Sequence, residues 1–361
     1  MKNRIFFLSL LLLILSYSGA PCKDPEQEIL SFLQKHTKKA VAKDHFSGVV
    51  LFAKGDKILF QEAHGLTDRE TNRANTLNTK FNLASASKMF TAVAIAQLYE
   101  EGKLSLSDPI GKFLDTAWIS SDVGTRVKVE HLLLHTAGFG MYWDEFFKYK
   151  DSLLTINDFQ KIVSDTLAFE PGSKFEYSNT GFILLGAIIE KITGQSYDDY
   201  IQKHIFDPCG MQSTGLFRQD QLKEDMAVGY FRDEEDKGKL KNNLHLHGLK
   251  GASAGGGWST ASDMHRFLLA LRSDKLIKKQ TRELFWTPSP CYAGYAYGFQ
   301  LSQEWVGHTG GFPGIEAFIH YFPQPDYVLI ILSNYYDSAV PLYDDTEKFL
   351  TELIKKYPLK Q

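Results

Sequence analysis

The segment NLASASKMFTAVAIAQLYEEGK (residues 82–103) places two polar side chains where an apolar helix begins. The periodicity from Met89 onward predicts a buried amphipathic helix that ends near Gly102. Its apolar face would comprise Phe90, Val93, Ala94 and Leu98. Residues three apart share a helix face, so the Ser85 hydroxyl and the Lys88 amine would be neighbours. Because an unpaired buried amine costs several kcal/mol, Lys88 either faces water or is retained for chemistry.

The composition is that of an ordinary globular protein. The chain has 361 residues, of which 43% are hydrophobic and 23% charged, with a formal net charge of -3. This length suffices for one large domain or two moderate ones. Without a basic excess, the sequence indicates no nucleic-acid partner.

The N-terminal segment has the layout of an export signal. Two basic residues precede an apolar run from Ile5 to Leu15, which is shorter than the about 20 residues that span a membrane. We expect residues 1–22 to be a secretory signal peptide or a lipoprotein signal, with an N-terminal anchor or buried strand as the alternative. Lipidation would fall on Cys22, although the preceding Pro21 is unusual for such a signal. The mature protein is therefore predicted to be periplasmic, secreted or envelope-associated, with membrane contact only through a lipid on Cys22.

The cysteines leave two interpretations open. If Cys22 is removed or lipidated, only Cys209 and Cys291 remain. An oxidising compartment would permit a disulfide between them, and two separate thiols are the alternative.

Strand patterns occupy both ends of the mature chain. GVVLFAKGDKILFQEAHGLTD (residues 48–68) predicts a hairpin that turns at Lys54-Gly55-Asp56. Further strands are predicted in YGFQLSQEW, GIEAFIHYF and DYVLIILSN, the last of which is apolar enough to be central. Helices are expected from Asp24 to about Lys43 and from about Pro341 to Lys356.

The middle of the chain is predicted to be mostly helical. Helical patterns lie in VKVEHLLLH, INDFQKIVSDTLAF and NTGFILLGAIIEKITGQ, the last with Asn179 as a candidate cap. We predict one α+β domain over residues 24–361, with an antiparallel sheet flanked by helices. The sheet part would cover about 24–110 and 251–361, and the helical part about 111–250. A site is expected where the two parts meet.

Three short motifs carry the candidate chemistry. The chain contains a single S-x-x-K, Ser85-Ala86-Ser87-Lys88, and a single Y-x-N, Tyr177-Ser178-Asn179. A third element, His308-Thr309-Gly310-Gly311, precedes an apolar strand. One S-x-x-K alone is weak, but three motifs in this order at predicted element boundaries are more specific.

These motifs and several longer phrases resemble one enzyme family. The phrases include EEGKLSLSDPIGKFL, VKVEHLLLHTAGF, FEPGSKFEYSNTGFILLGAIIEKITGQSYDDYI and GGGWSTASDMHRF. The chain resembles the class C serine β-lactamases and the penicillin-binding-protein-like hydrolases, which include DD-carboxypeptidases, D-amino-acid peptidases and esterases. Neither S-D-N nor K-T-G occurs, which argues against the class A branch. The resemblance implies a β-lactamase/transpeptidase-like fold and a serine hydrolase without metal or organic cofactor.

The resemblance also implies residue roles. Ser85 would be the nucleophile that forms an acyl-enzyme, and Lys88 would activate it. Tyr177 would share the proton transfers, and which of the two is the base stays open because they titrate together. Gly311 would contribute, with the backbone of Ser85, to the oxyanion hole. A helix cap for Ser85 and a core side chain for Tyr177 are the structural alternatives.

The remaining site residues are expected to bind substrate. Asn179 would hydrogen-bond a substrate amide or hold the lysine, and glycines at 310 and 311 would leave room for substrate along the strand edge. Thr309 belongs to the same motif. His308 departs from the lysine of many β-lactamases, and its reference pKa of about 6.5 leaves it mostly neutral at neutral pH. If His308 binds a substrate carboxylate, KM for acidic substrates should rise from about pH 6 to 8.

Other features have competing interpretations. His135 is expected in a structural loop near the site. The aromatic stretch GFGMYWDEFFKYKD either packs the helical part or forms a lip around Trp143 that selects apolar acyl groups. His245 and His247 would lie on one side of a strand, but the lack of further ligands makes zinc hydrolysis a weak rival. The second rival is a catalytically inactive relative that binds peptide or cell wall.

The substrate class stays open at this point. A small molecule or peptide is expected, and peptidoglycan-type peptides, esters and β-lactams all suit the same machinery. The sequence does not indicate an oligomeric state.

Overall fold

The computed structural model describes residues 24–236 and 238–357. The predicted export signal at residues 1–22, including Cys22, lies outside this range. Within it, an antiparallel six-stranded sheet has the order β2-β1-β12-β11-β10-β9. The strands of this sheet are β1 (Gly48–Lys54), β2 (Lys57–His64), β9 (Gln300–Leu301), β10 (Val306–Phe312), β11 (Ile315–Phe322) and β12 (Tyr327–Ser333).

The sheet joins the two ends of the chain, as predicted. Strand β1 pairs with β2 on one side and with β12 on the other, so an N-terminal hairpin continues a C-terminal meander. Every residue of β12 is buried, in agreement with its predicted central position. The predicted strand YGFQLSQEW is much shorter than expected. Of its residues only Gln300 and Leu301 form a strand, β9, which pairs with β10.

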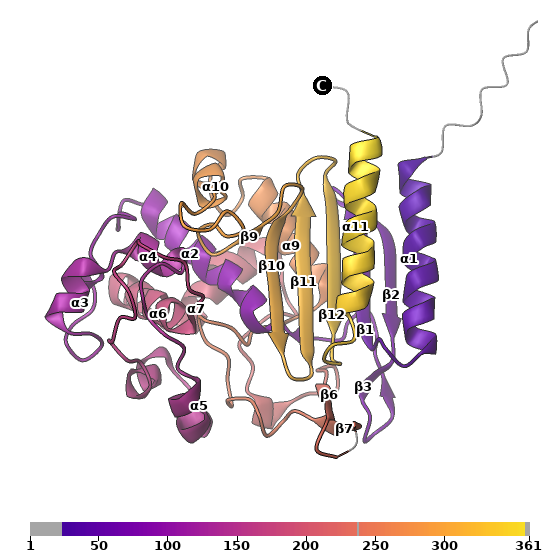
Figure 1. Ribbon diagram of the computed structural model, residues 1–361, viewed down its shortest axis with the longest axis horizontal. Coiled ribbons are helices and arrows are strands. Elements are labelled where there is room, and N and C mark those ends of the chain that lie inside the picture. Colours follow the sequence, from indigo (N-terminus) through magenta and orange to yellow (C-terminus); the bar gives the residue numbers. More distant parts are fainter. Residues whose placement is uncertain (1–23, 237, 358–361) are drawn as a thin grey trace, which may run out of the picture.

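Two long helices cover one face of the sheet. These are α1 (Pro25–Ala42) and α11 (Val340–Lys356), which lie side by side in Figure 1. Their apolar side chains form one core with alternate residues of the strands, including Ile29, Leu33, Val50, Phe52 and Leu350. Both helices agree with the predicted spans to within one residue.

The second core lies between the opposite face of the sheet and the helical part. It contains α2 (Lys88–Glu100), α9 (Ala261–Arg272) and α10 (Lys279–Phe285). Helix α2 is buried around its whole circumference over Lys88–Ala96, so the predicted amphipathic pattern is wrong there. The reason is that α2 passes between the sheet and the helical part and has no solvent face over this length.

The helical part is less regular than predicted. It contains α3 (Ser121–Arg126), α4 (Val129–Leu133), α5 (Trp143–Tyr149), α6 (Asn179–Thr193), α7 (Tyr197–Ile201) and α8 (Asp207–Cys209). The predicted helix INDFQKIVSDTLAF is only a 3-10 turn over Ile156–Lys161. A hairpin of β6 (Tyr230–Asp233) and β7 (Lys239–Asn242) also falls in this region.

Short strand pairs connect these parts. They are β3 (Leu66–Asp68) with β4 (Arg73–Ala74) and β5 (Phe81–Asn82) with β8 (Trp258–Ser259). The two cysteines within the described residues are free thiols, Cys209 buried in α8 and Cys291 exposed, so the alternative of a disulfide between them is not seen. None of the helices in the described ranges has the length and apolar character needed to cross a bilayer.

The packing of α11 predicts a measurable stability effect. Leu350 has no exposed surface, and truncating such a side chain to alanine typically costs about 2 to 5 kcal/mol. We expect Leu350→Ala to lower the free energy of unfolding by that amount in denaturant titrations. Glu352→Ala, at an exposed position of the same helix, should stay within about 0.5 kcal/mol of the unmodified protein. Equal effects of both substitutions would contradict the packing described for α11.

Candidate active site

Ser85 lies in a strained turn between β5 and α2. The turn is a 3-10 helix over Ala84–Ser87, so α2 itself begins only at Lys88. Ala84 has a φ of +43°, in the left-handed region that non-glycine residues rarely adopt. The Ala84 N–H donates to Asn82 Oδ1 at 2.8 Å, and the Ala84 carbonyl accepts from Gly256 N–H at 3.1 Å. A strained residue whose N–H and carbonyl are both fixed by hydrogen bonds, as here, is typical of functional sites.

Two glycines allow this turn to pack closely against its neighbours. A Cβ at Gly310 would lie 2.0 Å from the Leu83 carbonyl oxygen, and one at Gly255 would lie 2.9 Å from that of Ala84. The predicted reason for Gly310, space for substrate, is therefore wrong: the glycine lets β10 approach the backbone of the turn. Gly311 differs, because a Cβ there would meet nothing within 4 Å and the residue lines the pocket.

The amine of Lys88 is fully buried behind Ser85. Lys88 has 0% exposure, and its Nζ lies 3.3 Å from Ser85 Oγ, 2.7 Å from Asn179 Oδ1 and 2.5 Å from the Ala254 carbonyl oxygen. No carboxylate of the described residues pairs with it. Burial therefore lowers the pKa of Lys88 well below its usual value. A buried amine with a lowered pKa is suited to accept a proton.

Tyr177 and Asn179 flank this amine from the start of α6. Asn179 is the first residue of the helix, and its side chain accepts from Lys88, so its predicted capping role is wrong. The Lys88 Nζ lies 5.0 Å from the centre of the Tyr177 ring. The Tyr177 hydroxyl is buried and has no hydrogen-bond partner among the described residues. Burial raises the pKa of Tyr177, and the nearby Ser85 hydroxyl opposes that rise.

A buried chain of hydrogen bonds links the Y-x-N segment to β10. His135 Nδ1 accepts from the Ser178 N–H at 3.1 Å, and His135 Nε2 lies 3.0 Å from Tyr295 Oη. Tyr295 Oη lies 3.1 Å from His308 Nε2, and His308 Nδ1 lies 2.5 Å from the Thr309 carbonyl oxygen. Every donor in this series of hydrogen bonds has an acceptor when both imidazoles are neutral: His135 donates to Tyr295, and Tyr295 donates to His308.

His308 is consequently occupied by protein groups. Its side chain is 0% exposed, and both ring nitrogens have partners within the chain. Burial, assisted by nearby Lys88, lowers the pKa of His308 to about 3. We therefore revise the expected pH effect: His308 stays neutral between about pH 6 and 8 and gives no rise in KM for acidic substrates. Thr309 is partly exposed, and its N–H donates to Gln300 Oε1 at 2.8 Å.

His135 has a positioning role in this geometry. It adopts a φ of +56°, and its ring packs 4.2 Å from that of Tyr177, measured between centroids. Burial, with Lys88 nearby, holds the pKa of His135 well below its usual value. The neutral ring thus supports both Tyr177 and the backbone of Ser178.

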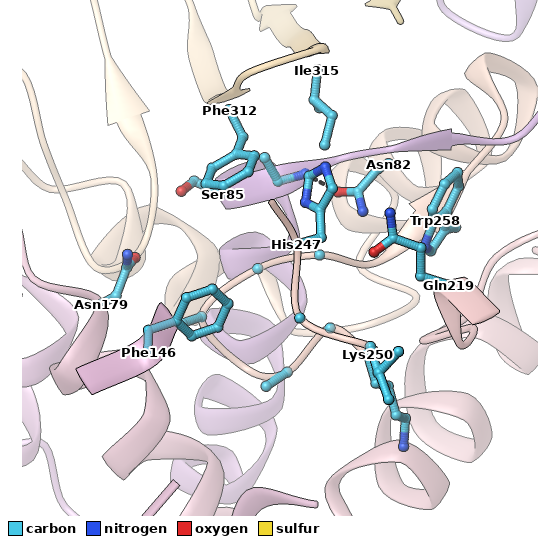
Figure 2. A pocket seen from close by; sticks show the side chains of 18 of the residues that line it. Asn82, Ser85, Phe146, Asn179, Gln219, His247, Lys250, Trp258, Phe312 and Ile315 are labelled. Atoms are coloured by element: carbon cyan, nitrogen blue, oxygen red, sulfur yellow. Dashed lines mark hydrogen bonds between the residues drawn. The ribbon is translucent and has the colours of Figure 1, made fainter. Parts of the chain in front are cut away.

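A pocket with aromatic walls opens next to Ser85. Of the predicted site residues, Ser85, Asn179 and Gly311 line it, whereas Lys88 and Tyr177 are not part of its lining. Figure 2 shows Ser85 and Asn179 among the lining side chains. Its aromatic lining consists of Tyr142, Trp143, Phe146, Phe159, Phe217, His247, Trp258 and Phe312. The Trp143 and Phe312 rings approach from α5 and β10, with centroids 5.9 Å apart. The aromatic stretch at 142–146 therefore contributes to the pocket as well as packing on the helical part.

The histidine pair in LHLHG does not form a metal site. The segment is a turn rather than the predicted strand, and His247 packs on Phe312 at a centroid distance of 4.6 Å. Burial, with Lys150 nearby, lowers the pKa of His247 to about 4. Within residues 24–236 and 238–357, no group of three His, Cys, Asp or Glu side chains could hold a metal ion.

Several site residues were missed at the sequence level. Tyr295 and Ala254 belong to no predicted motif, and they reach the site from separate loops. The glycine-rich run GASAGGG (residues 251–257) was an available signal for the loop, since such glycines often mark close backbone approach. Tyr295 lies in an aromatic-rich loop and had no local signal.

Comparison with known proteins agrees with this geometry. The family model described as Beta-lactamase matches residues 33–351. Penicillin-binding protein 4* of Bacillus subtilis (strain 168) is 32% identical over 317 residues, which cover 81% of this chain and 69% of that protein. The crystal structure of a penicillin binding protein from Bacillus halodurans has 30% sequence identity, covers 88% of this chain and 99% of its own, and has a TM-score of 0.79.

A more distant structure shows the fold alone. D-amino acid amidase from Ochrobactrum anthropi SV3 is 23% identical, with 91% of this chain and 99% of its own covered and a TM-score of 0.76. The fold is thus that of the β-lactamases and penicillin-binding proteins, as the resemblance implied. With the matched model extending over most of its length, the chain belongs to the Beta-lactamase family.

Proposed function

We propose that the protein hydrolyses an amide or ester through an acyl-enzyme on Ser85. The observation that supports this most is the buried Lys88 amine, 3.3 Å from Ser85 Oγ and without a carboxylate partner among the described residues. A protein that only binds peptide or cell wall gains nothing from burying an amine beside a serine, since binding does not require the desolvation cost of that amine. The family of the chain is consistent with hydrolysis by a serine nucleophile.

The hydrogen bonds of Lys88 indicate how Ser85 would be activated. A neutral amine has two N–H groups and one lone pair. Asn179 Oδ1 and the Ala254 carbonyl accept the two N–H groups, which leaves the lone pair for the Ser85 hydroxyl proton. The lowered pKa of Lys88 and the raised pKa of Tyr177 favour Lys88 as the base and a protonated Tyr177 as its partner.

The reaction then follows in two stages. Ser85 Oγ attacks the acyl carbon as its proton moves to Lys88, and the oxyanion is stabilised by the backbone N–H groups of Ser85 and Gly311. Breaking the bond to the leaving group transfers a proton to that group, with the unpartnered Tyr177 hydroxyl as the relay. Water repeats the attack on the ester of Ser85, which releases the acid and restores the hydroxyl. We place this activity outside the cytoplasm, on the basis of the predicted export signal.

Labelling of Ser85 tests the nucleophile directly. An uncharged fluorophosphonate should add one adduct to the protein, seen by intact mass and mapped by peptide sequencing to Ser85. Ser85→Ala should give no adduct and should lose hydrolysis of p-nitrophenyl butyrate, because the nucleophile is gone. Ser107→Ala, at an exposed serine, should behave as the unmodified protein. An adduct on Ser85→Ala, or full hydrolysis by it, would refute the assignment.

The environment of Lys88 predicts the pH dependence. The base must be neutral, and burial lowers the pKa of Lys88, so kcat/KM should rise with pH and level off below the ordinary lysine pKa of about 10.4. Lys88→Arg keeps a permanent cation, and this ascending limb should therefore disappear from its residual ester hydrolysis. An unchanged limb in Lys88→Arg would assign the titration to another group.

The aromatic wall predicts substrate preference. Trp143→Ala should lower kcat/KM for phenylacetyl esters roughly tenfold relative to acetyl esters, because the substitution removes an apolar wall of the pocket. Phe147→Ala is the matched control, since Phe147 lies in the same helix, is 50% exposed and does not line the pocket. The relative rates of the two ester classes provide the measurement. A uniform loss for both esters that follows a lower melting temperature would instead indicate that Trp143 only packs the helical part.

A further inference from the structure

The lining of the pocket beside Ser85 is almost free of charge. Of the residues that line it, Lys250 alone carries an acidic or strongly basic side chain. Its amine pairs with Asp198 of α7 and also donates to the Leu154 carbonyl oxygen at 3.3 Å. Figure 2 shows the Lys250 side chain extending away from Ser85. This charge is thus paired with the Asp198 carboxylate and points away from the reacting group.

The imidazoles near the pocket supply no positive charge either. His308 has both ring nitrogens bonded to Tyr295 and Thr309 and has no exposed surface. His247 lines the pocket but is packed against the Phe312 ring, and burial keeps it neutral at physiological pH. Lys88 is buried behind Ser85, and its N–H groups are directed at Asn179 and Ala254.

A substrate carboxylate in this pocket would therefore lose water without gaining an ion pair. The surrounding surface consists largely of aromatic rings, the uncharged amides of Asn82, Asn179 and Gln219, and residues 248–252 and 254–256. Placing an unpaired carboxylate in such surroundings is costly, whereas a carboxamide or an ester group is tolerated much better.

We propose that the site selects substrates whose leaving group is uncharged, namely neutral amides and esters, and discriminates against those with a free carboxylate beside the scissile bond. This inference rests on the proposed acyl-enzyme function of Ser85. It narrows the substrate class from any D-amino-acid peptide, ester or β-lactam to acyl compounds without an adjacent carboxylate.

A matched pair of thioesters tests the selection. Hippuric acid is joined as a thioester to thioglycolate or to its carboxamide, so that the two substrates share one acyl group and differ in the charge on the leaving thiol. Thiol release is followed at pH 7, and the rate with Ser85→Ala is subtracted as background. Each kcat/KM is then divided by the rate constant of enzyme-free hydrolysis of the same thioester, which corrects for the different leaving-group reactivity of the two thiols. We expect kcat/KM to be at least tenfold higher for the carboxamide. Equal rates, or faster release from the carboxylate, would overturn the proposal.

Substitution of Phe312 distinguishes charge from shape. Phe312→Lys places a cation next to Gly311, and we expect it to reduce the preference for the carboxamide at least fivefold. Phe312→Leu removes the ring without adding charge and should leave the preference as it was. The same preference in both variants would show that charge is not the cause. If neither thioester is released faster than by Ser85→Ala, the acyl-enzyme function itself fails, which is a different result from lost selectivity.

Discussion

The burial of the Lys88 amine is the constraint on which the site depends. An amine with no exposed surface is stable there only if its N–H groups find acceptors, and these come from Asn179 and the Ala254 carbonyl. Those two acceptors belong to α6 and to the glycine-rich loop before β8. Helix α2, helix α6 and that loop must therefore meet at one point. The meeting of the sheet part and the helical part is thus tied to the chemistry that we propose for the site.

Close backbone packing is the second requirement. The strained Ala84 turn is held between β10 and the 251–257 loop, and Gly310 and Gly255 permit that approach. Any side chain at Gly310 would displace β10 and with it the Gly311 backbone that faces the pocket. Strain at Ala84 is offset by the hydrogen bonds to Asn82 and Gly256. The turn holds Ser85 at the pocket surface while the next two residues, Ala86 and Ser87, remain buried.

The hydrogen-bond chain through His135, Tyr295 and His308 explains why an imidazole replaces a cation in β10. A neutral ring can donate at one nitrogen and accept at the other, and it thereby links Tyr295 to the Thr309 carbonyl. A protonated lysine, which is the cation in question, has no acceptor and could not receive the Tyr295 hydroxyl proton. These hydrogen bonds connect the Y-x-N segment to the strand that carries Gly311. Because the imidazole in this position is neutral, it adds no positive charge to the pocket.

Local sequence determined much of the framework, because the signals for it lie within a few residues. The hairpin, the terminal helices, the central strand and the three motifs were all predictable from periodicity, turn residues and unique spacing, and the resemblance added their roles. Tertiary structure alone decided the rest. Whether His308 faces substrate depends on Tyr295, which is 13 residues away and has no motif. Contacts between distant segments also produce the burial of α2 over Lys88–Ala96, the packing role of Gly310 and the neutral lining of the pocket. No local pattern encodes these contacts.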